Sequence, residues 1–194
     1  THHFEIPYQV RERMEAIARE HNITLSTLLY AAWGILLQKY NNSDDVMVGV
    51  TVSGRTPQVK GIDRMVGLFI NTLPLRLKAT GDNTAAEVFR SLAGHLEERD
   101  RDGCEHTSLT AIKPLTDLDK ESNLFESIIV IDNYPLDNLL TQPGSGQGTG
   151  KSLVIRSYEA FEMTSYDLTI QIMVKEEGSL GVDFHYHAEV FEEE

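Results

Sequence analysis

The segment from Val66 to Leu77 places polar residues inside an otherwise apolar run, which Asn71, Thr72, Pro74 and Arg76 interrupt. A buried amide or hydroxyl costs free energy unless it is hydrogen-bonded or lines a cavity. The run therefore has two interpretations. It is either a core strand whose Asn71 is satisfied inside the protein, or a strand whose polar side chains line a tunnel. The neighbouring residues must decide between these two interpretations.

Composition limits the fold and the partners. With 194 residues, 41% of them apolar, the chain can bury a substantial core and suits one domain or one large lobe. The net charge of −13 argues against nucleic acid or an anionic membrane as the main partner. No run approaches the roughly eighteen apolar residues of a membrane span, and Thr1 to Pro7 lacks the features of a signal peptide. The single Cys104 excludes an internal disulfide, so we expect a buried structural thiol and a cytoplasmic location.

Hydrophobic spacing predicts three helices. Two of them span Pro7 to Glu20 and Thr24 to Tyr40, and the second presents an apolar face. That face is expected to comprise Leu25, Leu28, Leu29, Ala32 and Leu36, with Trp33 beside them. The third begins with the capping box Thr84 to Glu87 and ends in the charged tract Glu97 to Asp102.

Strands are predicted between and after these helices. Val46 to Val52 and Leu124 to Ile131 are short apolar runs typical of buried strands. Alternating residues in Leu168 to Val174 and Leu180 to Tyr186, joined by a Gly-containing turn, predict an antiparallel hairpin. Together these elements predict an α/β fold, a two-layer sandwich of a mixed sheet backed by helices.

Ser145 to Ser152 ends in Gly-Lys-Ser, as a phosphate-binding loop does. The first glycine of that motif falls on Ser145, and the strand-like Leu153 to Ile155 follows where a helix is required. We therefore interpret the segment as a surface loop.

A metal site is the second possibility that the sequence raises. His185 and His187 share a strand face with Asp183, a spacing that metal ligands can have. The same three residues are also simply the polar side of an alternating strand, and we predict no metal site. His2 and His3 are adjacent, without a following Asp-Gly.

The remaining motifs lie at strand ends. Ser53-Gly54-Arg55 closes a buried strand, and Gly61 to Thr72 follows a few residues later. Glycine-containing loops after strands are where sites on α/β scaffolds are commonly built.

With these motifs the chain resembles the C-terminal half of the condensation domain of nonribosomal peptide synthetases. Met65 to Arg76 follows the family form V-G-x-F-I-N-T-x-P-x-R, after Ser53-Gly54-Arg55. Further matching stretches are Thr24 to Gly34, Glu105 to Leu109, Asn123 to Ser127, Asp132 to Pro135 and Ser165 to Leu168. The resemblance covers essentially the whole chain.

The resemblance implies one lobe of the chloramphenicol-acetyltransferase-like fold, a family of CoA-dependent acyltransferases. In the family two lobes enclose a tunnel, and carrier domains deliver thioesters on phosphopantetheine arms. The acceptor amine attacks the donor thioester, which forms a peptide bond in antibiotic and other secondary metabolism. The implied partners are an N-terminal lobe, donor and acceptor peptidyl carrier domains and an adenylation domain. The family histidine motif H-H-x-x-x-D-G is absent here, since Phe4 to Tyr8 follow His2-His3.

Three residues are expected to line the acceptor side of the tunnel: Ser53, Arg55 and Asn71. Ser53 would hydrogen-bond the amine or the pantetheine arm. Arg55 would hold the following loop through backbone carbonyls or pair with a carboxylate. Asn71 can donate and accept, which suits an amide-rich path. A purely structural role stays open for all three, and the loop Thr56 to Asp63 is expected to cross to the other lobe.

Two other functions stay open. The first is a lobe of a related epimerization domain. Epimerization domains typically depart from the F-I-N-T form, whereas Phe69 to Thr72 keeps it. A non-catalytic module that docks carrier proteins is the other. We expect the isolated lobe to be inactive, with its catalytic residues in the missing half.

Overall fold

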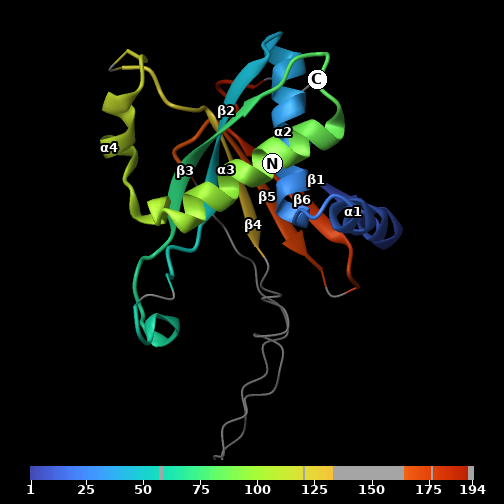
Figure 1. The fold of residues 1–194 in the computed structure, drawn as a ribbon, viewed down its shortest axis with the longest axis horizontal. Coiled ribbons are helices and arrows are strands. Elements are labelled where there is room, and N and C mark those ends of the chain that lie inside the picture. The colour runs from blue at the N-terminus through green and yellow to red at the C-terminus, as the bar shows by residue number, and fades with distance from the viewer. Residues whose placement is uncertain (57–58, 120, 133–163, 176, 192–194) are drawn as a thin grey trace, which may run out of the picture.

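A six-stranded mixed sheet forms the centre of the described part of the protein (Figure 1). The computed structural model describes residues 1–56, 59–119, 121–132, 164–175 and 177–191. The strand order is β1-β6-β5-β4-β2-β3, and β4 pairs parallel with both β2 and β5 while the other pairs are antiparallel. The strands are β1 (His2–Ile6), β2 (Asp45–Val52), β3 (Asn71–Lys78), β4 (Ser127–Asp132), β5 (Leu168–Val174) and β6 (Leu180–Tyr186).

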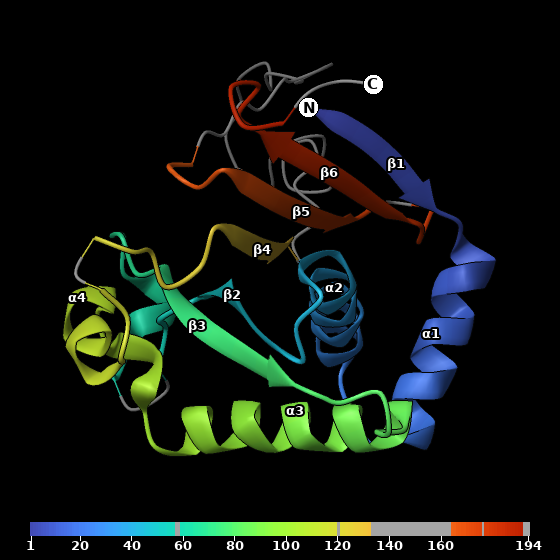
Figure 2. The same cartoon turned by 90° about the horizontal axis from the view of Figure 1, so that it is seen from above.

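The three long helices lie on one side of this sheet (Figure 2). They are α1 (Tyr8–Glu20), α2 (Leu25–Asn41) and α3 (Ala85–Arg101), and the short helical segments are η1 (Ile62–Arg64), η2 (Cys104–His106), α4 (Leu109–Ile112) and η3 (Lys113–Leu115). Thr84 and Glu87 form the predicted capping box at the start of α3. The predicted mixed sheet backed by helices is confirmed. Among the described helices none has the length and apolar character needed to cross a bilayer.

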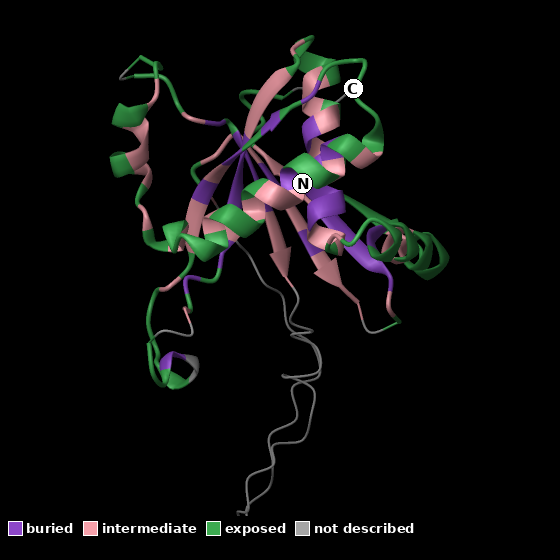
Figure 3. Ribbon diagram, in the orientation of Figure 1, coloured by how far each residue is buried: buried purple, intermediate pink, exposed green. Residues whose placement is uncertain are grey.

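The core lies between α2, α3 and the sheet, where buried residues gather (Figure 3). Alternate residues of the strands supply one side of it, and Ile129 on β4 is completely buried. Trp33 reaches the sheet from α2 and donates from Nε1 to Ser127 Oγ at 3.3 Å. The other members include Val48, Val50, Leu75, Leu77, Ile170, Ile172, Leu180 and Val182 on strands, with Leu29, Tyr30, Ala31, Val88 and Leu92 on helices.

The predicted apolar face of α2 is partly wrong. Ala32 and Leu36 are exposed, whereas Tyr30, Ala31 and Gly34 are buried. A Cβ on Gly34 would lie 2.9 Å from Leu77 Cδ1, so the helix and β3 approach each other closely at this glycine. The face of α2 that packs on the sheet is therefore the one that contains Gly34, and not the one predicted from the large aliphatic side chains.

β1 was not predicted. Its side chains are mostly exposed and carry no alternating apolar pattern. The strand exists because it pairs with β6, where His3 Nδ1 and Asp183 Oδ1 lie 2.5 Å apart and Phe4 stacks on Phe184. These partners are some 180 residues away in sequence, beyond the reach of any local pattern.

The apolar run from Val66 to Leu77 is only half a strand. β3 begins at Asn71, and Leu73, Leu75 and Leu77 are buried as expected. The residues before Asn71 are not core residues, because Val66 is fully exposed and Leu68 is 95% exposed. The strand predicted over Leu124 to Ile131 likewise begins late, at Ser127, and the predicted hairpin of β5 and β6 is confirmed.

Candidate functional site

The candidate site lies where β2 ends and β3 begins. Val52 is paired with Asn71, so Ser53-Gly54-Arg55 leave the sheet beside the chain that enters it. Gly54 has a φ of +61°, a conformation that favours glycine. A Cβ on Gly54 would lie 1.9 Å from the carbonyl oxygen of Phe69. The glycine therefore lets the two segments meet backbone to backbone, which brings Ser53 and Arg55 against the chain that precedes Asn71.

Arg55 fixes the shape of the connecting loop. Its Nη1 donates to the carbonyl oxygens of Ile62 and Met65, the latter at 3.1 Å. Its guanidinium also lies over the Phe69 ring, 4.5 Å from the ring centroid. Among the described residues no carboxylate pairs with it. Two contacts were predicted for Arg55, with backbone carbonyls or with a carboxylate. The described residues show the contact with backbone carbonyls.

Asn71 binds a segment after α3 instead of leaving its amide free. Its Nδ2 donates to the carbonyl oxygens of Glu105 at 2.9 Å and Thr107 at 3.0 Å. Its Oδ1 accepts from the backbone N–H of Thr72 at 3.0 Å. Both donors of the amide are thus used inside the protein. The structure supports the internal interpretation of this polar interruption, and contact of Asn71 with a substrate stays a prediction.

Ser53 has a different environment from Asn71. Asn71 lies opposite Val52, which is buried on the helix-covered face of β2, so these two side chains share that face. Ser53 follows Val52 and is exposed. Its Oγ accepts from the Arg55 backbone N–H at 3.3 Å, and among the described residues it makes no other hydrogen bond. The hydroxyl hydrogen of Ser53 is therefore available to a ligand.

The residues Met65 to Ile70, which we name the apolar loop, project from this end of the sheet. Val66 and Leu68 are almost fully exposed and Ile70 is 67% exposed. Arg55 nevertheless contacts this loop at two points, because it donates to the Met65 carbonyl and lies over the Phe69 ring. A loop that presents alternate aliphatic side chains to solvent is typical of a surface that another protein segment covers.

The histidines considered for metal binding do not come together. Asp183 is bound to His3, and His185 Nδ1 lies 3.2 Å from Thr1 Oγ1. His187 lies after the end of β6 and donates its backbone N–H to Asp167. Within the described ranges no three His, Cys, Asp or Glu side chains are grouped to hold a metal ion. The Ser145–Ser152 segment lies outside the described residues.

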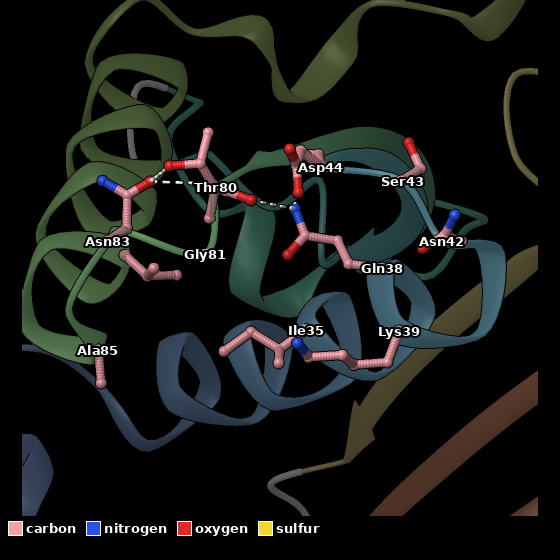
Figure 4. Close-up of a pocket in the computed structure, with 12 residues that line it drawn as sticks. Ile35, Gln38, Lys39, Asn42, Ser43, Asp44, Thr80, Gly81, Asn83 and Ala85 are labelled. Atoms are coloured by element: carbon pink, nitrogen blue, oxygen red, sulfur yellow. Dashed lines mark hydrogen bonds between the residues drawn. The ribbon is translucent and has the colours of Figure 1, made fainter.

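A cavity of about 450 Å³ occupies the opposite end of β2, between α2 and the chain that joins β3 to α3 (Figure 4). None of Ser53, Arg55 and Asn71 lines it. At this end Arg76 Nε donates to Asp45 Oδ1 at 2.7 Å. The hydrogen bonds from Arg76 hold the pKa of the Asp45 carboxyl below its ordinary value and raise the pKa of the guanidinium.

Sequence reasoning missed two parts of the candidate site and placed one residue wrongly. It did not pair Gly54 with Phe69 or Asn71 with the Glu105–Thr107 carbonyls, since both pairs join residues far apart in the chain. The positive φ of Gly54 is the kind of demand that a glycine after a strand can signal. Cys104 was expected to be buried and is exposed in the short turn η2, because the turn leaves the end of α3 at the surface.

Comparison with known proteins gives a family for the chain. A family model described as the condensation domain matches residues 1–194. The chain is 39% identical to tyrocidine synthase 2 of Brevibacillus parabrevis over 191 residues, which is 98% of the chain and 5% of that protein. It is 38% identical to surfactin synthase subunit 2 of Bacillus subtilis (strain 168) over 158 residues, or 81% of the chain and 4% of that protein. The chain thus spans a small part of the proteins it resembles.

Solved structures agree on the fold. The first condensation domain of the calcium-dependent antibiotic synthetase, in complex with a substrate analogue, superposes with a TM-score of 0.72 at 19% identity. That match covers 98% of this chain and 39% of the solved one. A four-domain nonribosomal peptide synthetase bound to AMP and glycine gives a TM-score of 0.80 at 18% identity, over 96% of this chain and 15% of that one. The expected chloramphenicol-acetyltransferase-like fold is therefore confirmed. With a family model matched from end to end and this fold beneath it, the chain belongs to the condensation-domain family.

Proposed function

We propose that the chain is the C-terminal lobe of a condensation domain that forms peptide bonds between carrier-bound thioesters. The observation that carries the proposal lies where β2 ends and β3 begins. There an exposed Ser53 hydroxyl lies beside the apolar loop, whose exposed side chains no other described residue covers. The extent of the structural match supports the proposal, since nearly all of this chain superposes on about two-fifths of a solved condensation domain. The remaining part of such a domain would supply the second lobe.

The second lobe is the partner that the apolar loop requires. Val66, Leu68 and Ile70 project from one edge of the protein, and burying them would remove a large apolar area from water. Arg55 already fixes the loop, so little conformational entropy is lost when it docks. We propose that the N-terminal lobe covers this loop and that the tunnel runs beside Ser53.

The proposed reaction joins an acceptor amine to a donor acyl group. The amine nitrogen attacks the thioester carbon, a C–N bond forms, the C–S bond breaks and the donor's phosphopantetheine thiol leaves with a proton. Both thioesters are substrates brought by carrier domains, so the lobe binds no cofactor of its own. The amine must lose a proton, which a positioned histidine can assist. The motif that supplies this histidine in the family is absent from the chain, so we place the catalytic residues in the N-terminal lobe.

The other partners follow from this role. We propose donor and acceptor peptidyl carrier domains at the two mouths of the tunnel, an adjacent adenylation domain, and a cytoplasmic location. Within the lobe, Ser53 is the group proposed to meet the substrate arm. Arg55 and Asn71 are proposed to shape the path, Arg55 through the loop carbonyls and Asn71 through the Glu105–Thr107 segment.

Two substitutions in the complete two-lobe domain separate these roles. Ser53→Ala should slow peptide formation by about tenfold, the scale of one lost hydrogen bond, and leave the free energy of unfolding unchanged.

Asn71→Asp should lower the free energy of unfolding by about 2 kcal/mol, because a carboxylate cannot donate to the Glu105 and Thr107 carbonyls and lies against their oxygens. Single-turnover peptide formation on carrier domains and urea unfolding measure the two effects.

Ser91→Ala is the matched control, since Ser91 is exposed on α3 far along the chain from the site. It should leave peptide formation unchanged and raise the free energy of unfolding by no more than about 0.5 kcal/mol, since alanine is a better helix former than serine. Full turnover by Ser53→Ala would show that the hydroxyl does not meet the substrate. An Asn71→Asp variant as stable as the parent would remove the proposed positioning role of the amide.

A further inference from the structure

The strands β2 and β4 separate at their carboxyl ends. These two parallel strands pair at two successive positions, the second of which joins Val50 to Ile129. Both strands continue beyond it and stay paired with their other neighbours, β2 with β3 as far as Val52 and β4 with β5 as far as Asp132. The hydrogen-bond ladder between β2 and β4 therefore ends early, at the end of the sheet that carries Ser53. We call this point the ladder break.

The ladder break lies where binding sites on such sheets are commonly found. After β2 the chain continues to β3 on one side, and after β4 the next described strand is β5, on the other side. Ligands of α/β sheets bind outside the carboxyl ends of parallel strands, at the point where the connections diverge in this way. A ligand of this sheet is therefore expected at the ladder break.

The ladder break leaves two backbone groups without a partner. Asp44, directly before β2, accepts from the N–H of Ala79, so the even-numbered residues of β2 bond to β3 and the odd-numbered residues point toward β4. In this register the next bond of the ladder would join the Thr51 carbonyl to the Ile131 N–H. The pairing stops before that bond, and among the described residues neither group makes another hydrogen bond. The Thr51 carbonyl is thus an acceptor that no described residue uses.

Ser53 and Asp132 flank the ladder break on the face of the sheet opposite the helices. Each lies four residues beyond the paired Gly49 and Ile128, so they hold the same position on neighbouring strands. Ile131 packs against the core, and alternation along β4 puts Asp132 on the other face. Ser53 shares that face because it too follows a core-facing residue. A small polar group between the two strand ends can therefore contact both side chains.

Asp132 is an oriented carboxylate with one oxygen unused among the described residues. Gln171 on β5 donates from Nε2 to Asp132 Oδ2 at 2.8 Å, and this contact is partly buried. Within the described ranges Oδ1 accepts no hydrogen bond and no cation pairs with the carboxylate. Asp183 on β6 differs, because it lies opposite Gln171 on the same face and is paired with His3. Asp132 is therefore the carboxylate of this face that can bind a cationic donor.

These groups together select a primary amine. The Thr51 carbonyl and Asp132 Oδ1 are unused acceptors, and Ser53 Oγ, which accepts once from Arg55, can accept again. A primary ammonium carries three N–H donors and no acceptor, so it matches three such oxygens and one negative charge. We propose that Asp132 positions the α-amine of the acceptor amino acid, which it binds as the ammonium beside Ser53. This inference rests on the proposed function, which brings a carrier-bound amino acid to this end of the sheet.

The first test measures peptide formation by the complete two-lobe domain, with a carrier-bound donor and increasing concentrations of alanyl-S-pantetheine as the soluble acceptor. Asp132→Asn keeps an oxygen for Gln171 and removes the charge, so the urea midpoint should not change. The KM for the acceptor should rise about tenfold or more, the scale of a lost hydrogen bond to a charged group.

The pH profile separates a positioning role from a structural one. A carboxylate beside the amine favours the ammonium, whereas attack requires the neutral amine. In Asp132→Asn the rise of kcat with pH should therefore move to lower pH, by about one unit. A residue that only supports the fold would not move this rise. The other charged side chains printed on this face are already paired: His3 with Asp183, Lys175 with Glu5 and Arg76 with Asp45.

Asp183→Asn is the matched control, since Asp183 lies on the same face and asparagine still offers an oxygen to His3. It should leave both the acceptor KM and the pH profile unchanged. Peptide formation by the parent domain, with the same KM and pH profile in Asp132→Asn, would overturn this inference alone. Absence of peptide from the parent domain would overturn the proposed function and this inference with it.

Discussion

Replacing Gly54 with alanine should destabilise the protein by about 3 kcal/mol, because two separate penalties coincide at this residue. The left-handed φ of +61° costs an L-residue roughly 1–2 kcal/mol. The new Cβ would also lie 1.9 Å from the Phe69 carbonyl oxygen, a backbone atom that no side-chain rotation can move. Relieving that overlap requires the strand end and the apolar loop to separate, for which overpacking costs of about 1–3 kcal/mol are typical.

Urea unfolding measures this loss, and Gly61→Ala is its matched control. Gly61 also has a positive φ, +79°, but a Cβ there would meet no atom within 4 Å. The control should therefore lose only the conformational part, about 1 kcal/mol. Equal losses at Gly54 and Gly61 would mean that the contact with Phe69 is not formed. A Gly54→Ala variant that keeps the parent stability would contradict the described geometry of the site.

Gly49→Ala is the second substitution with a large expected effect, and it acts in the middle of β2, between β4 and β3. A Cβ on Gly49 would lie 2.3 Å from Phe125 Cε2 and 2.6 Å from Ile128 Cγ2. Phe125 is buried and stacks on Tyr166, with 5.3 Å between ring centroids, so it has little room to move. We expect a loss of about 2–3 kcal/mol in the free energy of unfolding, from displacement of this aromatic pair.

Gly94→Ala should have the opposite effect on the free energy of unfolding, measured by the same urea unfolding. Gly94 lies inside α3, and an added Cβ would meet nothing within 4 Å. Alanine there should stabilise the protein by about 0.5–1 kcal/mol, since glycine is a poor helix former. A Gly49→Ala variant that matches Gly94→Ala in sign would show that Phe125 does not cover the glycine.

The sequence predicted the elements of this fold better than their contacts. Local patterns identified α1, α2, α3, β2 and the β5–β6 hairpin, because each carries its own spacing or cap. β1 escaped because its stability comes from pairing with β6, and the buried face of α2 was misjudged because Gly34 lets β3 approach. In both cases a tertiary contact outweighed the local pattern.

At the candidate site, too, the sequence predicted the residues better than their contacts. Ser53, Arg55 and Asn71 were recognised as a group, and the structure does bring the strand ends that carry them together. What the residues do there depended on atoms from elsewhere in the chain. The Ile62 and Met65 carbonyls turn Arg55 into a loop anchor, and the Glu105 and Thr107 carbonyls occupy the Asn71 amide. The exposure of Val66 and Leu68 reversed the expectation of a buried run, since an exposed apolar segment can have the same composition as a core strand.

We propose that this chain is one lobe of a peptide-bond-forming domain and depends on the other lobe for activity. The most direct measurement is peptide formation between two aminoacyl carrier domains, with the chain alone, with a separately produced N-terminal lobe alone, and with both. We expect product only when both lobes are present, and a loss of that product when the exposed Val66 and Leu68 are replaced together by aspartate. Product from this chain alone, or full activity of the aspartate variant with the second lobe, would contradict it.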